Sequence, residues 1–286
     1  MYSVTPEPST LPALNFGGSG PRLHFAHANG YPPLTYTPLI ETLRPHYHVT
    51  AMLARPLWPG EDPGAHQDWS VFVQDLTQFL DGQGARGLYG VGHSLGALTT
   101  LMVACQRPDF FRAIVLIDPG LLSPAHSFVW RWIKHFGLVN QFHPYAGFTL
   151  KRRRLFPSVE AMYAHFRPKP LFARVDDRGV RAFVEAAARP RPDGQVELAF
   201  PPEWEMWIYE TMPHDLWPKL RRLQVPLLLI YGEHSDTFLP GSARALRRAL
   251  PQAELHGLRG AGHLVPLEKP GAVGELIHAF FQKQSG

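Results

Sequence analysis

Residues 88–97 read LYGVGHSLGA, and this stretch decides how the rest of the chain is interpreted. A short apolar run ends in the glycine-rich sequence GHSLG at 92–96, and small or apolar residues then continue to Ala104. A buried strand, a tight turn and a helix in this order would present Ser94 as a candidate nucleophile. The pattern G-x-S-x-G is short enough to occur by chance, so its meaning depends on the surrounding sequence.

The composition is that of a folded globular protein. The chain has 286 residues, of which 45% are hydrophobic and 18% charged, so it can bury a large core. Its formal net charge is +4, and the one dense basic run is KRRR at 151–154. We expect this run to be a solvated face, with binding of a nucleic acid or an anionic surface as the alternative. A single cysteine excludes an intrachain disulfide and a cysteine-based metal site.

The beginning of the chain predicts the compartment. Residues 1–16, MYSVTPEPSTLPALNF, carry no basic segment and no long apolar run, so we expect no signal peptide and no transmembrane helix. We therefore predict a cytoplasmic protein that acts on a small-molecule substrate, without nucleic acid and without membrane insertion. The oligomeric state stays open.

Strand-like and helix-like segments alternate through the first part of the chain. Apolar β-like runs are predicted at 22–28, 47–54, 87–91 and 113–118, with helices at 68–81 and 95–106. The same alternation returns at the end, with strands at 225–232 and 253–258 and helices at 242–250 and 271–283. This order predicts an α/β fold with a mostly parallel central sheet and helices on both faces.

The alternation stops between the two parts. Residues 120–218 are rich in Trp, Phe, Arg, His and Pro, and they contain helical pieces such as 159–166 and 179–188. We predict a discontinuous core, 1–119 and 219–286, with a helical cap inserted at 120–218. The aromatic side chains of the cap either pack its helices onto the core or line an apolar pocket.

Three polar residues follow predicted strands at their carboxyl ends, where ligands bind in parallel α/β sheets. They are Ser94 in GHSLG, Asp236 in GEHSDTFLP and His263 in GAGHLVPLEKP. With these motifs the chain resembles the α/β-hydrolase fold superfamily, and in particular its capped, esterase-like serine hydrolases. The order Ser, Asp, His is the order of that family.

The resemblance implies a role for each residue. Ser94 would be the nucleophile, His263 the base that takes its proton, and Asp236 the acid that orients the imidazole. The family more often has its acid where this chain has Ser235, so one residue is inserted before Asp236. Asp118, directly after the strand at 113–118, is the alternative acid.

An oxyanion hole is expected from two backbone N–H groups. Leu95 N–H, at the start of the helix, would supply one of them. The other would come from the loop HANGY at 27–31, from Tyr31 N–H or from Asn29 by its side chain or backbone. His27 is expected to make a structural hydrogen bond, and His93 to serve packing and turn geometry.

The predicted function is hydrolysis of carboxylic esters of small or medium apolar acids through an acyl-enzyme. The alternatives are hydrolytic C–C cleavage of diketone-like substrates and a non-catalytic ligand-binding protein of the same fold. The histidines show no metal-ligand spacing, so we expect no metal and no cofactor.

Overall fold

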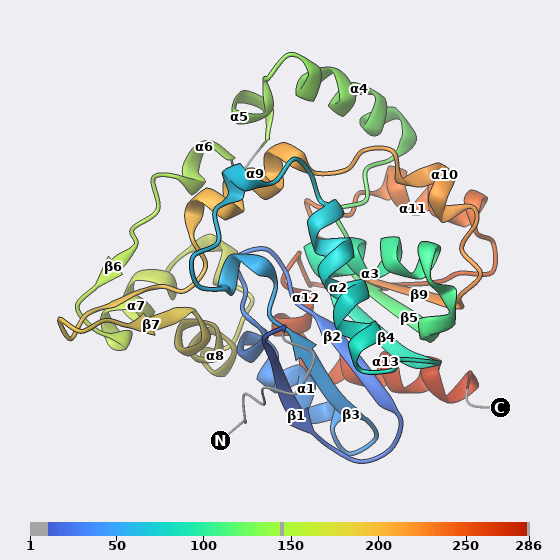
Figure 1. The fold of residues 1–286 in the computed structure, drawn as a ribbon, viewed down its shortest axis with the longest axis horizontal. Coiled ribbons are helices and arrows are strands. Elements are labelled where there is room, and N and C mark those ends of the chain that lie inside the picture. The colour runs from blue at the N-terminus through green and yellow to red at the C-terminus, as the bar shows by residue number, and fades with distance from the viewer. Residues whose placement is uncertain (1–10, 144–145, 285–286) are drawn as a thin grey trace.

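The computed structural model describes residues 11–143 and 146–284. Its centre is a seven-stranded sheet in the order β1-β3-β2-β4-β5-β9-β10 (Figure 1). Only β1 runs antiparallel to its neighbour, and the other neighbours are parallel. The strands are β1 (Ala13–Gly17), β2 (Arg22–Ala26), β3 (His48–Met52), β4 (Leu88–His93), β5 (Phe111–Ile117), β9 (Leu227–Gly232) and β10 (Glu254–Leu258).

Alternate side chains of the central strands enter two separate apolar clusters. In β5, Val115 and Ile117 join one cluster, whereas Ile114 and Leu116 join the other. Side chains of a strand alternate between the two sheet faces, and both faces are covered by helices here, so the central strands are apolar throughout. The first face packs on α1 (Thr37–Leu43) and α13 (Pro270–Lys283), and the second on α2 (Ser70–Gly82), α3 (Leu95–Gln106) and α11 (Pro240–Ala249).

The chain between β5 and β9 lies above and to the left of the sheet in Figure 1. Its helices are α4 (Pro124–His135), α5 (Val139–Phe142), α6 (Ala146–Thr149), α7 (Val159–Phe166), α8 (Asp177–Ala187), α9 (Pro202–Thr211) and α10 (Leu216–Leu220). A second sheet, in the order β6-β8-β7, consists of β6 (Leu155–Phe156), β8 (Val196–Leu198) and β7 (Ala188–Pro190). The division at 119/120 and 218/219 stays a prediction.

The remaining elements are short. They are α12 (Val265–Glu268) and the 3-10 helices η1 (Pro33–Tyr36), η2 (Arg55–Leu57), η3 (Pro63–Ala65), η4 (Pro108–Phe110) and η5 (Pro170–Phe172). The predicted fold class is confirmed, and every predicted strand and helix of the core is present within a few residues. Neither β1 nor the small β6-β8-β7 sheet was predicted from the sequence.

Candidate active site

Ser94 occupies the sharp turn between β4 and α3, as predicted. Its backbone angles are φ 52° and ψ −112°, a conformation that costs a non-glycine residue energy and recurs at functional sites. Ser94 N–H donates to Ile117 O at 3.0 Å, and Ser94 O accepts from Leu98 N–H at 3.2 Å. The turn is therefore fixed on both sides, with the Ser94 side chain at a partly exposed position.

The two glycines around Ser94 allow backbones to approach closely. A Cβ at Gly96 would lie 2.1 Å from Ala26 O, and one at Gly92 would lie 2.4 Å from Gly96 O. Any side chain would force the start of α3 away from β2 and β4. The two glycines of the GHSLG motif are thus required by the packing of this turn.

His263 lies beside the Ser94 turn, in the loop between β10 and α12. Its ring centroid is 4.9 Å from that of His93, the residue before Ser94. Its Nδ1 makes a 2.9 Å hydrogen bond with Asp118 Oδ1. Because an ionised carboxylate only accepts, Nδ1 carries the hydrogen and Nε2 has the free lone pair. No hydrogen bond joins Ser94 Oγ to His263 Nε2 in the described chain; such contacts often tighten only with substrate.

Asp118 is completely buried at the end of β5 and is held by several donors. Besides His263, it accepts Gly232 N–H at 2.9 Å and the Ser235 hydroxyl at 2.5 Å. Its own φ of 41° is in the left-handed region, which turns the carboxylate toward the histidine loop. These donors hold the carboxylate in one orientation.

The structure brings Asp118, and not Asp236, to His263. Asp236 is exposed, and its Oδ1 accepts the hydroxyl of Thr237 at 3.3 Å. Nδ1 of His263 has one hydrogen to donate, and that hydrogen is directed at Asp118. The sequence contained one indication of this arrangement, because Ser235 occupies the position where the family more often has its acid. In the structure the Ser235 hydroxyl donates to Asp118, which follows β5.

A buried chain of hydrogen bonds links the loop at 27–31 to the histidine loop. Ala28 N–H donates to the Tyr36 hydroxyl at 3.2 Å, which makes a 2.7 Å bond with His93 Nδ1. His93 Nε2 bonds to His263 O at 3.0 Å. A carbonyl only accepts, so Nε2 carries the hydrogen and Nδ1 accepts from Tyr36. Burial, followed by the charge of His263, lowers the pKa of His93 well below its ordinary value, in keeping with a neutral ring.

The structure also distinguishes the candidate oxyanion donors. Tyr31 N–H donates to Ala28 O at 3.2 Å and is therefore engaged in the loop's own turn. Within residues 11–143 and 146–284, no acceptor is found for the N–H groups of Asn29 and Leu95. The side chain of Asn29 is committed elsewhere, because its Nδ2 donates to Glu205 O at 3.3 Å.

An ion pair lies over this loop and was not predicted. Glu205 of α9 is buried, and both of its oxygens accept from Arg152 Nη1. Its carboxylate lies so close to Gly30 that a Cβ there would be 3.1 Å from Oε1. Burial raises the pKa of Glu205, and Arg152 opposes that rise. The basic run at 151–154 is thus not wholly a solvated face, since Arg152 is directed inward.

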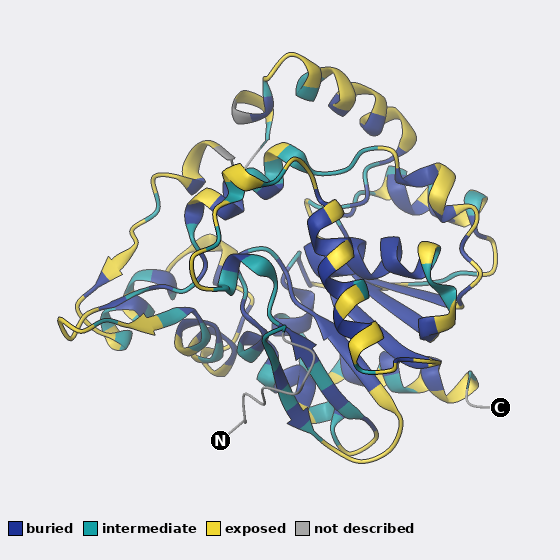
Figure 2. Ribbon diagram, in the orientation of Figure 1, coloured by how far each residue is buried: buried dark blue, intermediate teal, exposed yellow. Residues whose placement is uncertain are grey.

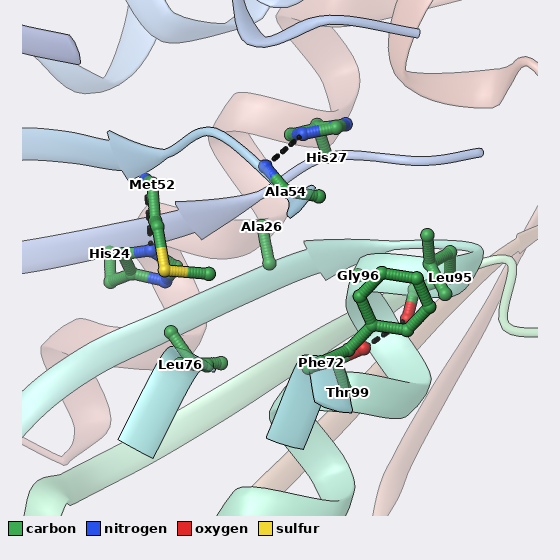
Figure 3. Close-up of a pocket in the computed structure, with 10 residues that line it drawn as sticks. All are labelled: His24, Ala26, His27, Met52, Ala54, Phe72, Leu76, Leu95, Gly96 and Thr99. Carbon is green, nitrogen blue, oxygen red and sulfur yellow. Dashed lines mark hydrogen bonds between the residues drawn. The ribbon is translucent and has the colours of Figure 1, made fainter. Parts of the chain in front are cut away.

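A small cavity lies behind the loop, between β2, β3, α2 and the start of α3 (Figure 3). Its volume is about 30 Å³, and its wall is mostly apolar, with Met52, Phe72 and Leu76 among the lining residues. His27 forms part of its wall, with Nε2 accepting Ala54 N–H at 3.0 Å and Nδ1 bonded to Ala28 O at 2.9 Å. His27 therefore makes structural hydrogen bonds, as expected.

Comparison with known proteins decides the family. A profile of the Alpha/beta hydrolase family matches residues 25–276. The chain belongs to the α/β hydrolase family. It is 26% identical over 256 residues to the uncharacterized hydrolase YugF of Bacillus subtilis, covering 87% of this chain and 85% of YugF. It is 25% identical over 214 residues to the esterase YbfF of Escherichia coli, covering 74% of each chain. These relationships place the chain among the hydrolases.

Solved structures agree on the fold of this α/β hydrolase. It superposes on E-2-(acetamidomethylene)succinate hydrolase with a TM-score of 0.84 at 19% identity, over 99% of this chain and 100% of that one. It superposes on the esterase Rv0045c of Mycobacterium tuberculosis with a TM-score of 0.73 at 21% identity, over 99% and 91% of the chains.

Among the described residues, no group of three His, Cys, Asp or Glu side chains could hold a metal ion.

Proposed function

We propose that this α/β hydrolase is a serine hydrolase whose catalytic triad is Ser94, His263 and Asp118. The observation that carries the proposal is the buried Asp118–His263 hydrogen bond beside the strained Ser94 turn. His263 Nε2 takes the proton of Ser94 Oγ as the oxygen attacks the substrate carbonyl, and then gives it to the leaving group. Water attacks the resulting acyl-enzyme in the second half of the reaction.

The negative charge on the carbonyl oxygen during attack needs donors that are already in place. We assign this role to the N–H groups of Leu95 and Asn29, because both lack an acceptor in the described chain. Leu95 N–H also lies at the N-terminus of α3, where the helix dipole favours negative charge. Each donor of this kind contributes about 3 kcal/mol of transition-state stabilisation.

The surroundings of Ser94 favour an uncharged, apolar acyl group. Leu95, directly after Ser94, is buried and apolar, and Leu121 and Ile208 belong to the same extended apolar cluster of the core. Arg152 lies over the loop at 27–31, and Glu205 already neutralises it. We therefore prefer esters of small or medium apolar acids to diketone-like substrates, whose C–C hydrolysis calls for recognition of a carboxylate.

The test is labelling and turnover with matched serine variants. The wild type is expected to react with a fluorophosphonate probe and to hydrolyse p-nitrophenyl acetate or butyrate. Ser94→Ala should lose both while remaining folded, and Ser19→Ala, an exposed hydroxyl outside the site, should keep both. Wild-type turnover by Ser94→Ala would refute the proposal, and faster cleavage of a vinylogous diketone than of any ester would favour C–C hydrolysis.

A further inference from the structure

Exposed apolar side chains of the described residues concentrate on one segment. Of nine large hydrophobic side chains that are exposed, seven lie between Phe128 and Leu150. In α4, Phe128, Trp132 and Phe136 are spaced by four residues and are 60%, 45% and 63% exposed. Four-residue spacing places them in one stripe along the helix and the turn that follows it. Exposed apolar patches of this kind mark interaction sites.

The aromatic stripe faces outward because the opposite side of α4 packs on the rest of the protein. Trp130 is buried, and Lys134 Nζ donates to Met212 O at 3.0 Å, so that side is attached to the molecule. Along the stripe, the rings of Phe128 and Trp132 are 6.4 Å apart, and those of Trp132 and Phe136 stack at 6.0 Å. Figure 2 shows α4 on the outer rim of the molecule, with much of its surface exposed.

The charged residues of the segment that carries the stripe all have the same sign. No Asp or Glu occurs between Asp118 and Glu160, whereas this stretch contains six Lys or Arg residues. Arg152 and Arg154 pair with Glu205 and Glu203, which belong to another part of the chain. The other four are Arg131, Lys134, Lys151 and Arg153. In the described chain no ion pair to Asp or Glu is found for Arg131, Lys151 or Arg153, and all three are exposed.

We propose that α4 docks the enzyme peripherally on an anionic phospholipid surface. The α4 face consists of Phe128, Val129, Arg131, Trp132 and Phe136. Aromatic side chains enter the boundary between headgroups and acyl chains, while nearby cations attract anionic headgroups. None of the described helices is long and apolar enough to cross a membrane.

Charge complementarity favours this occupant over a second copy of the chain. A twofold dimer through the α4 face would bring the same residues of both copies together. The α4 face carries one cation, Arg131, and no Asp or Glu, so such a contact would bring like charges together. An anionic lipid surface offers the opposite charge to the same side chains.

Flotation with phospholipid vesicles tests the proposal. The full chain is expected to float with vesicles of equal parts phosphatidylcholine and phosphatidylserine, and much less with phosphatidylcholine alone or at high salt. Trp132→Ser should weaken binding about tenfold, since an aromatic side chain no longer leaves water. Arg131→Gln should weaken it about fivefold.

Two matched control variants remove an apolar side chain or a positive charge at positions outside α4. Leu171→Ser removes an exposed apolar side chain that is not on α4, and Arg247→Gln removes an exposed charge of α11. Both should bind as the wild type does. Equal binding to neutral vesicles, binding unchanged by Trp132→Ser, or a dimer that Trp132→Ser dissociates would overturn the proposal. Repeating the assay with Ser94→Ala keeps the result independent of hydrolysis.

Discussion

Asp118 receives hydrogen bonds from two separate parts of the chain: from His263, and from Gly232 and Ser235 in the turn after β9. This arrangement makes the carboxylate both an orienting group for the imidazole and a packing centre for the loops around it. Substitutions at this residue and its partners therefore test the triad more directly than substitutions at the surface.

Asp118→Asn is expected to lower kcat by about 10⁴-fold, because an amide stabilises the wrong tautomer of His263. Asp236→Asn is the matched control, since it makes the same chemical change at an exposed carboxylate. It should keep kcat within about twofold of the wild-type value. Steady-state kinetics with a p-nitrophenyl ester measure both. The reverse ranking of the two variants would return the acid role to Asp236.

Ser235→Ala removes one donor from Asp118 without touching the substrate. A hydrogen bond to a charged group contributes about 2 kcal/mol, so kcat should fall by about 10- to 30-fold. KM should stay near its wild-type value, because the loss is in orientation of the base. An unchanged kcat would mean that Gly232 and His263 alone fix the carboxylate.

At the scale of elements, β2, β4 and β10 each end in a loop that contributes to the site. The hydrogen-bonded chain through Tyr36 and His93 connects these loops, from Ala28 N–H to His263 O. It thereby joins the loop of the proposed oxyanion donor Asn29 to the loop of the proposed base His263, through the residue that precedes Ser94. Tyr36 and His93 act as positioning residues in this arrangement.

Tyr36→Phe is expected to lower kcat about tenfold with KM nearly unchanged, because Ala28 N–H and His93 Nδ1 lose their shared partner. Tyr47→Phe is the matched control: it removes a hydroxyl bonded to His278 Nδ1 at 3.0 Å, outside the site. Kinetics and thermal unfolding of both variants give the comparison. Equal effects on kcat would show that the Tyr36 bond serves stability alone.

The elements were predictable where their pattern was long or fully apolar. The central strands β4, β5 and β9 and the helices α2 and α3 were predicted within a few residues. In contrast, β1 is a five-residue edge strand in which only Leu14 and Phe16 are buried, a weak signal beside Pro12 and Gly17. The strands of the β6-β8-β7 sheet have only two or three residues, too few for alternation to appear.

The parts of the site that directly follow a predicted strand could be located from the sequence. The turn at Ser94 and the loop of His263 followed from sequence order. The choice between Asp118 and Asp236 did not, because both follow parallel strands, and only the left-handed backbone at Asp118 shows which one turns inward. The contact from Asn29 to Glu205 joins residues 176 positions apart, which no local pattern reveals.

At the scale of the whole molecule, buried histidines link stability to pH. Burial, with a smaller contribution from His27, lowers the pKa of His24 from 6.5 to about 3, and burial lowers that of His27 to about 4. The unfolded chain takes up protons near pH 6.5, and the folded chain does so only near these lower values. The free energy of unfolding should therefore fall as the pH decreases from about 6.5 toward 4.

Each such histidine contributes up to about 1.4 kcal/mol per pH unit to this slope. Urea unfolding at a series of pH values measures it. His24→Gln, which has no titrating group at this position, should lower the free energy of unfolding at neutral pH. It should also make that free energy less dependent on pH, because about one proton fewer is taken up on unfolding. A slope equal to that of the wild type would show that His24 is protonated in the folded state.

The position of Asp118 has a consequence for annotating genomes. Asp118 lies directly after β5, and Ser235 occupies the position after β9 where the family more often has its acid. These two positions can be recognised in a sequence without a structure. We expect that other hydrolases with a serine at the position of Ser235 and an aspartate at the position of Asp118 use that aspartate as the acid of their triad. An automated assignment that takes the aspartate after β9, here Asp236, would differ from the triad proposed above, in which Asp118 is the acid.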